Sequence, residues 1–408
     1  MQAKLSVRNV YKIFGDNTAD ALARVRRGEA KTAILEQTGA TIGVQDASFE
    51  VSQGEIFVVM GLSGSGKSTL VRMLNGLIAP TSGEILVDGE DIASCPPLAL
   101  QRIRRDKVAM IFQHFALFPH WTVAANVAYG LKVKGVGAAE RRARAMETLE
   151  QVGLTAWADS LPSELSGGMQ QRVGLARGLA TGPEILLMDE PFGALDPLIR
   201  RQMQEELLAL QKTMKKTIIF ITHDLNEALL LGDRIAIMKD GRLVQTGTAQ
   251  EIVTHPVDDY VGAFVADIDR GRVFTADDIS GPPVSIQLHG NTSDQALRLM
   301  DDADSHALHV VDGERLVGLV TYKDLTAQAG DTAVRPGTLG QVLITEFATV
   351  DGNAPLHTLS TAAGSGLPIA VTDGRDRLVG VVQPRDVLAQ LSADTPAAHT
   401  EATDAQSR

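Results

Sequence analysis

Short hydrophobic runs that end in polar residues recur across the first part of the chain. They lie at Glu55 to Met60, Val108 to Phe112, Ile185 to Met188 and Thr217 to Thr222. These strand-like runs alternate with helical stretches such as Leu198 to Met214, and the alternation predicts an α/β unit with a largely parallel sheet. In such sheets ligands bind beyond the carboxyl ends of the strands. Functional residues are therefore expected directly after these runs.

A hairpin and two helices are predicted to close this part of the chain. Arg234 to Met238 and Arg242 to Thr246 flank Asp240-Gly241, a strong signal for a tight turn between two strands. Ala249 to Thr254 and Asp259 to Val265 follow as predicted helices.

From about residue 270 onward the sequence repeats itself. Residues 307–325 read ALHVVDGERLVGLVTYKDL, and residues 368–387 read PIAVTDGRDRLVGVVQPRDV. Each half predicts a strand, a turn with Gly, a second strand, and a helix that starts at Asp324 or Asp386. We expect two small modules at about 276–328 and 340–391, after a linker at 267–275 and before a disordered tail at 392–408. The alternative is a chance similarity of two hydrophobic hairpins.

Composition and charge narrow the class of protein. The chain has 408 residues, more than one ordinary core accommodates, so two or three domains are expected. It has no apolar run long enough for a membrane span, and its start does not resemble a signal peptide. Its single cysteine, Cys95, cannot form an internal disulfide, so a cytosolic protein is expected. Residues 276–408 hold 8 Lys and Arg against 18 Asp and Glu, a net of −10 out of −12 for the whole chain. An acidic chain without a long basic run is a poor candidate for binding nucleic acid.

A glycine-rich segment directly follows the first hydrophobic run. Gly61 to Ser68 reads GLSGSGKS and matches G-x-x-x-x-G-K-[ST], between a predicted strand and the predicted helix Ser68 to Leu77. The glycines let successive backbone N–H groups surround a phosphate, and the helix N-terminus adds positive potential. Lys67 would reach the β- and γ-phosphates, and Ser68 would bind Mg²⁺. A flexible glycine loop without function is the alternative.

Two carboxylates, Asp189 and Glu190, follow the run Ile185 to Met188. Unpaired charges at the end of a buried strand are costly, so these groups need a partner. A magnesium–nucleotide complex supplies one: Asp189 would hold the metal, and Glu190 would orient and deprotonate water. Without the glycine-rich loop, such a pair would more often be a helix cap or a solvated turn.

Further motifs accompany these two in a fixed order. Leu165 to Gln170 reads LSGGMQ, Gln113 follows a strand, Ala194 to Asp196 reads ALD, and His223 follows the run Thr217 to Thr222. This set resembles the ATP-binding-cassette (ABC) ATPase family over roughly residues 4–266. The resemblance implies a P-loop ABC-type nucleotide-binding domain at 1–266, which works as a homodimer. Each ATP would lie between the P-loop of one subunit and the signature segment of the other.

The resemblance also implies roles for the matching residues. Ser166 and Gly168 would contact the γ-phosphate across the interface, Gln113 would sense magnesium and water, and His223 would hold the γ-phosphate and position Glu190. Phe14 matches the aromatic residue that stacks on adenine, and Tyr11 is the nearby competitor. The implied catalytic residues are Glu190, His223 and Gln113, the metal ligands are Ser68, Gln113 and Asp189, and the ATP-binding residues are Phe14, Gly61, Ser63, Gly64, Ser65, Gly66, Lys67, Ser68, Thr69, Ser166, Gly167, Gly168 and Asp196.

Three segments narrow the resemblance to one branch of that family. Residues 116–123 read ALFPHWTV and resemble the segment that receives a cytoplasmic helix of the membrane subunit in bacterial importers. With them, a helical insertion at about 18–40 and a C-terminal pair that resembles cystathionine-β-synthase-type (CBS) modules are similar to the ATP-binding subunit of glycine betaine/proline betaine importers. The resemblance implies ATP hydrolysis coupled to transport by a peripheral subunit at the cytoplasmic face of the inner membrane. Its partners would be an integral membrane permease and, indirectly, a solute-binding protein.

The CBS resemblance implies regulation. Such pairs commonly bind adenosine nucleotides through a Thr and an Asp spaced like Thr321 and Asp324, whereas the second repeat has Gln383 with Asp386. One regulatory adenine-nucleotide site is therefore expected. Sensing of ionic strength, binding of a cyclic dinucleotide, and a mere packing role stay open as alternatives.

Other functions share part of this pattern. An importer for another small solute would carry the same motifs, because the solute does not touch this chain. A soluble ABC ATPase that acts on nucleic acid would need two cassettes in one chain or a basic surface. A nucleotide sensor without transport would have a damaged Glu190 or signature segment, and both are intact.

Overall fold

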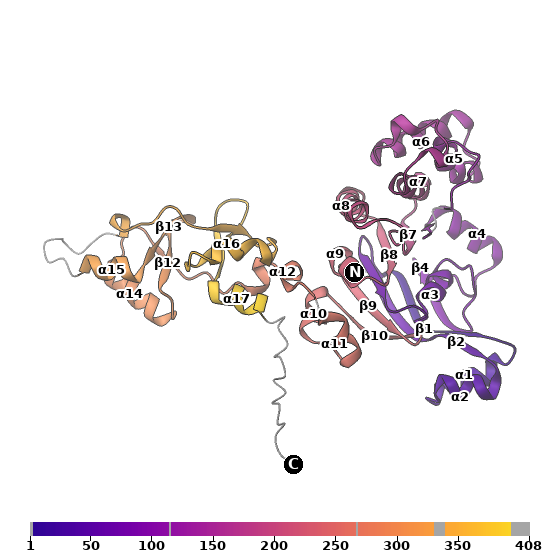
Figure 1. Cartoon of the computed structure of the whole chain (residues 1–408), viewed down its shortest axis with the longest axis horizontal. Helices are drawn as coiled ribbons and strands as arrows, with labels where there is room; N and C mark the ends of the chain where they lie inside the picture. Colours follow the sequence, from indigo (N-terminus) through magenta and orange to yellow (C-terminus); the bar gives the residue numbers. More distant parts are fainter. Residues whose placement is uncertain (1–2, 114–115, 267, 330–338, 393–408) are drawn as a thin grey trace, which may run out of the picture. The chain divides into compact units, whose positions relative to one another are not determined.

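The computed structural model divides into two units, Met1–Val265 and Ala266–Arg408 (Figure 1). A six-stranded sheet stands at the centre of the first unit. The structure describes residues 3–113, 116–266, 268–329 and 339–392. The strand order is β10-β9-β3-β8-β7-β6, and all neighbours are parallel except β10 with β9. Because β3, β8 and β7 are parallel neighbours, the residues that follow them lie at one edge of the sheet. The strands are β3 (Ile56–Met60), β6 (Val108–Ile111), β7 (Ile185–Asp189), β8 (Thr217–Thr222), β9 (Arg234–Lys239) and β10 (Arg242–Gly247).

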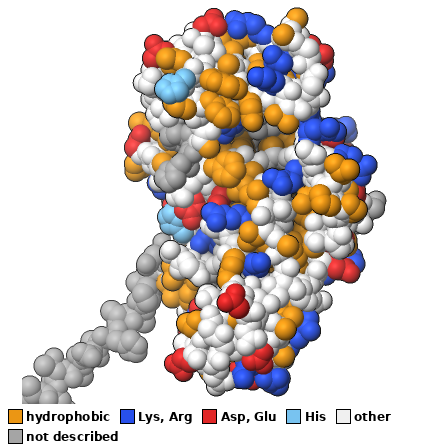
Figure 2. All heavy atoms as spheres, turned by 90° about the vertical axis from the view of Figure 1, so that its right-hand side faces the viewer, with side chains coloured by type: hydrophobic (Ala, Val, Ile, Leu, Met, Phe, Trp, Pro, Cys, Tyr) orange, Lys and Arg blue, Asp and Glu red, His pale blue; other side chains and the backbone are white. Residues whose placement is uncertain are grey.

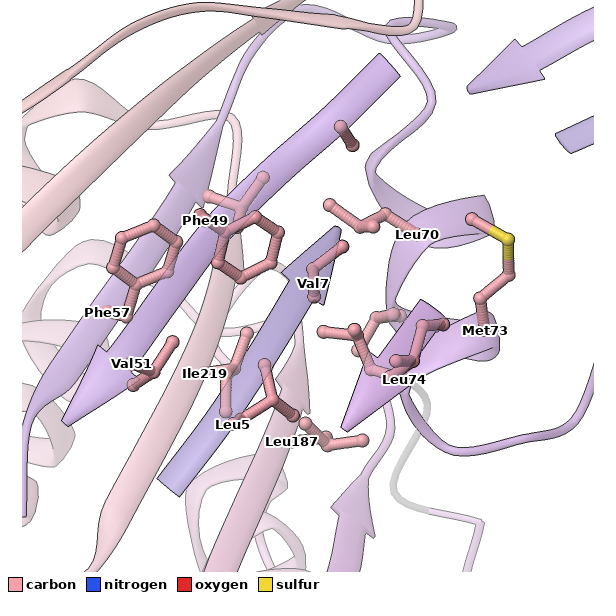
Figure 3. Close-up of a cluster of buried hydrophobic side chains, with 14 of the residues drawn as sticks. Leu5, Val7, Phe49, Val51, Phe57, Leu70, Met73, Leu74, Leu187 and Ile219 are labelled. Atoms are coloured by element: carbon pink, nitrogen blue, oxygen red, sulfur yellow. The ribbon is translucent and has the colours of Figure 1, made fainter. Parts of the chain in front are cut away.

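A second, antiparallel sheet packs against the first through helix α3 (Lys67–Leu74) and a shared core. Figure 3 shows side chains of both sheets and of α3 gathered in this core. Phe49 of the second sheet stacks on Phe57 of the first, with 4.9 Å between the ring centroids. This packing fixes the axis of α3 and so the position of its N-terminus. The strands of the second sheet, in the order β2-β1-β4-β5, are β1 (Ala3–Phe14), β2 (Thr41–Ser52), β4 (Ser82–Val87) and β5 (Glu90–Asp91).

The remaining helices of the first unit form two groups beside the sheets. Helices α5, α6 and α7 pack on one another, and α1 and α2 form the predicted insertion over β1 and β2 (Figure 1). No helix in the described ranges is long and apolar enough to span a membrane. The helices are α1 (Thr18–Arg26), α2 (Lys31–Thr38), α4 (Pro97–Asp106), α5 (Val123–Val133), α6 (Ala138–Gln151), α7 (Gly167–Ala180), α8 (Pro197–Met214), α9 (Leu225–Leu231), α10 (Ala249–Thr254) and α11 (Asp259–Val265), with 3₁₀ turns η1 (Thr155–Trp157) and η2 (Pro162–Glu164).

The second unit contains two three-stranded sheets of one topology. In each sheet the first two strands are parallel and the last two are antiparallel, so the two halves of the sequence repeat fold alike. The strands are β11 (Ser285–Gln287), β12 (Ala307–Asp312) and β13 (Arg315–Thr321), then β14 (Thr349–Asp351), β15 (Ile369–Thr372) and β16 (Leu378–Val382). The helices are α12 (Arg270–Val273), α13 (Ala276–Ile279), α14 (Ser293–Asp302), α15 (Tyr322–Ala329), α16 (Ser360–Ala363) and α17 (Pro384–Ser392), with η3 (Leu339–Gln341) and η4 (Leu356–Leu359).

The start of the second unit differs from the linker that was predicted at 267–275. It contains α12, and Val273 and Phe274 are buried in the second unit. The Leu356 N–H donates to the Phe274 carbonyl (2.8 Å), and Gly281 pairs with Val381. Residues 270–281 therefore pack against the second repeat, because their apolar side chains are buried there. Of the tail predicted at 392–408, Ser392 is the last residue of α17. Residue 267 and residues 393–408 lie outside the described residues.

Candidate functional site

The loop between β3 and α3 leaves no room for side chains at two of its glycines. Gly61 and Gly66 have φ angles of 154° and 105°. A Cβ on Gly61 would lie 2.2 Å from the Met238 carbonyl oxygen, and one on Gly66 would lie 2.4 Å from the Gly43 carbonyl oxygen. Strand β9 and strand β2 thus press directly on the loop. Glycine at these positions is what lets the backbone N–H groups turn toward a phosphate.

Lys67 is the first residue of α3 and is almost fully buried, with 4% of its surface exposed. Its Nζ donates to the carbonyl oxygens of Gly61 (2.7 Å) and Leu62 (3.0 Å). Burial lowers the pKa of Lys67, and the carboxylates of Glu190 and Asp189 oppose that shift. A buried ammonium held by neutral oxygens gains from an anionic ligand, so the site suits a phosphate.

Asp189 is the last residue of β7, and its carboxylate lies beside the start of α3. The Ser68 hydroxyl is 3.4 Å from Asp189 Oδ1. Burial raises the pKa of Asp189, and the neighbouring Glu190 carboxylate raises it further. Bringing a cation to this pair would reverse the shift, and hard oxygen donors such as a carboxylate and a hydroxyl suit Mg²⁺. The residues present therefore fit a magnesium–phosphate complex.

Glu190 joins three strand ends. Its backbone N–H donates to the Ile221 carbonyl of β8 (3.0 Å), and its φ of 46° is unusual for a residue with a side chain. Its Oε2 lies 3.1 Å from His223 Nδ1 and 3.4 Å from Gln113 Nε2. The structure thus brings together the three side chains that were predicted to be catalytic.

A buried network behind His223 was not predicted from the sequence. The Thr222 hydroxyl donates to Glu227 Oε2 (2.6 Å), and Gln204 Nε2 donates to Glu227 Oε1 (3.0 Å). Burial raises the pKa of Glu227, which is 5% exposed. The network ties β8 to α9 and α8, so it fixes the turn that carries His223. In the sequence Glu227 is only an acidic residue in the first turn of a helix, which is a common helix-start feature.

Phe14 and Tyr11 differ in exposure. Phe14 ends β1 with 40% of its surface exposed, whereas Tyr11 is 8% exposed and packs in the cluster under the insertion. A Cβ on Gly43 would lie 2.8 Å from Phe14 Cε2 and 3.2 Å from Thr69 Cγ2. Phe14 is therefore partly exposed near the helix of the phosphate loop, and Lys12 Nζ lies 5.1 Å from the centroid of its ring. This geometry favours Phe14 as the stacking residue.

The signature segment and Asp196 cap helices at the surface. Ser166 accepts a hydrogen bond from the Met169 N–H (3.4 Å) at the start of α7, and Asp196 accepts one from the Ile199 N–H (3.1 Å) at the start of α8. Ser166, Gly167 and Asp196 are exposed, whereas Gly168 is buried. Exposed helix starts of this kind are open to a second subunit. The other predicted ATP-binding residues, Ser63, Gly64 and Ser65, lie in the loop before α3.

The segment 116–123 leads into an aromatic cluster next to a groove. The Phe118 ring lies 4.6 Å from Trp121 and 4.8 Å from Tyr129, measured between centroids, whereas Phe115 lies outside the described residues. A groove of about 540 Å³ runs between α4, β6, α5 and α7. Figure 2 shows hydrophobic side chains in a broken band across this side of the molecule, with Lys and Arg beside it. The groove is lined by Asn75, Gln101, Arg104, Arg105, Val108, Ala109, Met110, Phe112, Tyr129, Gly130, Val133, Arg177, Gly178 and Thr181.

In the second unit the two repeats differ at the predicted nucleotide position. The Thr321 hydroxyl donates to Asp324 Oδ2 (2.6 Å), and the Asp324 N–H donates to the Thr321 oxygen (3.2 Å). In the second repeat the Asp386 N–H bonds instead to the Gln383 backbone carbonyl (3.0 Å). Only the first repeat pairs a hydroxyl with the carboxylate.

Comparisons with known proteins place these features in context. Residues 44–193 match the family model described as ABC transporter, and residues 277–329 match the CBS domain. The chain is 46% identical to the glycine betaine/proline betaine transport system ATP-binding protein ProV of Salmonella typhimurium, over 97% of this chain and 99% of that protein. It is 47% identical to the glycine betaine/carnitine transport ATP-binding protein GbuA of Listeria monocytogenes, over 96% and 98%. Among solved structures, a dimeric post-hydrolysis state of the ATP-binding cassette MJ0796 bound to ADP and Pi matches with a TM-score of 0.51 and 33% identity, over 60% of this chain and 98% of that one.

Proposed function

The chain belongs to the ATP-binding subunits of ABC transporters, and we propose that the transporter it drives imports quaternary-amine osmolytes such as glycine betaine or proline betaine. The similarity to transport proteins for these solutes runs through both units, not only through the ATPase. The observation that carries the proposal is the meeting of Glu190, His223 and Gln113 beside a phosphate loop, joined to that full-length similarity. The test is to measure osmolyte import by cells that carry the other transporter subunits, with and without this chain.

The geometry supports a division of labour in ATP hydrolysis. Lys67 and the loop backbone bind the phosphates, while Ser68, Asp189 and Gln113 would hold Mg²⁺, which neutralises phosphate charge when bound. Glu190 takes a proton from the water that attacks the γ-phosphorus as the bond to ADP breaks. His223 holds the Glu190 carboxylate in place through its Nδ1.

The working form is a homodimer with two ATP sites. Ser166 and Gly168 lie at the start of α7, and Asp196 lies at the start of α8. Exposed helix starts attract anions, because unpaired backbone N–H groups and the helix dipole point outward there. A second copy would bring Ser166 and Gly168 onto the γ-phosphate in the site of the first. The related cassette MJ0796 has been solved as a dimer in two structures, which supports this arrangement.

The docking site for a membrane permease is the groove between α4 and α5 together with the adjoining segment 116–123, whose Phe118 packs on the groove residue Tyr129. The permease lies at the cytoplasmic face of the inner membrane, and a solute-binding protein acts through it. The groove is lined by apolar side chains together with polar ones that include Arg104 and Arg105, which suits an amphipathic helix. Leu117→Glu or Phe118→Glu should uncouple transport while basal ATPase activity survives. Leu35→Glu, an equally charged change on the insertion, serves as the control. A permease cross-linked elsewhere would contradict this assignment.

The second unit regulates the ATPase through an adenine nucleotide bound at Thr321 and Asp324. The Thr321 hydroxyl, which donates a hydrogen bond to the Asp324 carboxylate, and this carboxylate can both turn to a ribose. The second repeat has Gln383 in place of the hydroxyl residue. Asp324→Ala should remove a response of transport to adenine nucleotide, and Asp386→Ala should leave it. A response to ionic strength that survives Asp324→Ala would favour screening of the acidic unit instead.

A further inference from the structure

The first turn of α8 joins two parts of the site that lie far apart in the sequence. Helix α8 contacts both α7, which begins in the signature segment, and α9, which follows His223 (Figure 1). Asp196, Arg200 and Gln204 are spaced by four residues, so they share one face of α8. The middle residue of this face, Arg200, reaches the turn that carries His223.

The Arg200 guanidinium contacts three groups. Its Nη2 donates a hydrogen bond to the carbonyl of Leu195, in the ALD segment (3.2 Å). Its Nη1 lies 3.5 Å from Asp224 Oδ2, and its Nε lies 3.9 Å from Glu227 Oε1. Asp224 directly follows His223 and caps α9. Arg200 thus links the segment before α8 to the residue after His223.

The contacts of Arg200 with the two carboxylates are long. Both exceed the roughly 2.7–2.9 Å of a charge-assisted hydrogen bond, and within the described ranges the buried Nε has no hydrogen-bond partner. A buried donor without a partner is costly, so a movement of α8 toward α9 that completes these bonds is favourable. The Glu227 carboxylate is itself held by Thr222 (2.6 Å) and Gln204 (3.0 Å). Arg200 is therefore only half engaged with a fixed acceptor.

The first turn of α8 also packs on the signature segment. A Cβ on Gly168 would lie 2.5 Å from Ile199 Cγ2, so the start of α7 rests directly on the residue before Arg200. Close-packed groups leave no gap that absorbs a movement. A shift of the signature segment therefore displaces the turn that carries Arg200.

We propose that Arg200 is a positioning residue, which transmits a movement of the signature segment to His223 and so couples the two ATP sites of the dimer. The proposal rests on the proposed homodimer. In that dimer the signature segment of one subunit meets the ATP of its partner, whereas His223 serves the ATP of its own subunit. ATP in one site thus sets His223 in the other, and hydrolysis becomes cooperative, with a Hill coefficient above one.

The first test removes the charge of Arg200. In the full chain, Arg200→Gln keeps a donor for the Leu195 carbonyl but loses the attraction to Asp224. It should lower the kcat of ATP hydrolysis about 5- to 50-fold, within the usual range of coupling between sites, and bring the Hill coefficient to one. The Kd for MgATP and the melting temperature should stay close to the wild-type values, because Arg200 lies outside the phosphate loop. Arg200→Lys keeps the charge and should recover part of the lost rate.

Arg201→Gln is the matched control for this test. Arg201 is the next residue of α8, and it forms an exposed pair with Glu205. The control should match the wild type in kcat and in Hill coefficient. A wild-type Hill coefficient of one would overturn the proposal, and so would an unchanged coefficient in Arg200→Gln. A parallel loss of kcat, MgATP affinity and melting temperature would also overturn it, since that pattern marks a merely structural role.

The second test asks whether Arg200 acts through Asp224. Asp224→Asn removes the charge but keeps the cap of α9, because asparagine caps helices as well as aspartate does. Alone it should lower the kcat, and in the Arg200→Gln background it should have no further effect, since coupled groups share their effect. Equal effects in both backgrounds would overturn the route through Asp224. Wild-type protein that fails to hydrolyse ATP would instead contradict the proposed function itself.

Discussion

Replacing Glu190 with Gln tests the centre of the mechanism with the smallest change in shape. The amide keeps the size of the carboxyl group and can still bond with Gln113 and His223, whose nitrogens lie 3.4 and 3.1 Å from Glu190 Oε2. What it loses is the basic oxygen that accepts the proton of the attacking water. Loss of a positioned general base costs about 10²–10⁴ in rate, which corresponds to roughly 3–5 kcal/mol of transition-state stabilisation.

Nucleotide binding should move in the opposite direction. The Glu190 carboxylate is one cause of the raised pKa of Asp189, so the Gln variant leaves Asp189 more readily ionised. An ionised Asp189 holds a cation better, and one repulsive charge near the γ-phosphate is gone. Glu190→Gln should therefore bind MgATP at least as tightly as the wild type and accumulate as a closed dimer.

Phosphate release under single-turnover conditions measures the rate, and light scattering after size exclusion with ATP measures the dimer. Glu205→Gln is the matched control, because Glu205 is an exposed carboxylate on α8 that pairs with Arg201. It should turn over like the wild type. A Glu190→Gln protein with near-normal turnover would refute the assignment of Glu190 as the base.

Three further outcomes follow from the geometry. Phe14→Ala should raise the Kd for ATP by about 5- to 100-fold, the range of one base–aromatic stacking contact, whereas Tyr11→Phe should not; equal effects in a titration would contradict the choice of Phe14. Gly61→Ala should abolish ATP binding, because its Cβ would lie 2.2 Å from the Met238 carbonyl oxygen; calorimetry that finds tight binding would contradict this. Burial lowers the pKa of His309 to about 4 from 6.5, so the unfolded chain binds a proton more readily than the folded one. The free energy of unfolding of the second unit should therefore be highest above pH 6.5 and fall by up to roughly 3 kcal/mol toward pH 4. Melting curves across this range should flatten in His309→Leu, and an equally steep fall in that variant would assign the effect to other groups.

The elements with strong local patterns were the ones that the sequence could predict. The strands β3, β7 and β8 are continuous hydrophobic runs, and they appear within one residue of the predicted bounds. The meeting of Glu190 and His223 was also foreseeable, because both follow parallel strands that end at one edge of a sheet. Such predictions depend on periodicity and on the geometry of parallel sheets, which a short window of sequence records.

Contacts between distant segments left no such record. Helix α12 has four residues, and only its burial against the second repeat separates it from a linker. Glu227 supports the turn that carries His223 only because Thr222 and Gln204 donate hydrogen bonds to it. Tertiary packing decides these features, and a single sequence does not contain a local trace of it.

The backbone of Glu190 has a consequence for how this position changes over generations. Its φ of 46° lies in the left-handed region, which costs a residue with a side chain roughly 1–2 kcal/mol compared with glycine. Selection for stability alone would favour glycine or asparagine here, and only selection for hydrolysis keeps glutamate. Glu190→Gly should therefore raise the melting temperature while it abolishes turnover. A descendant freed from the need to hydrolyse ATP is expected to lose this side chain early, because the loss makes the fold more stable.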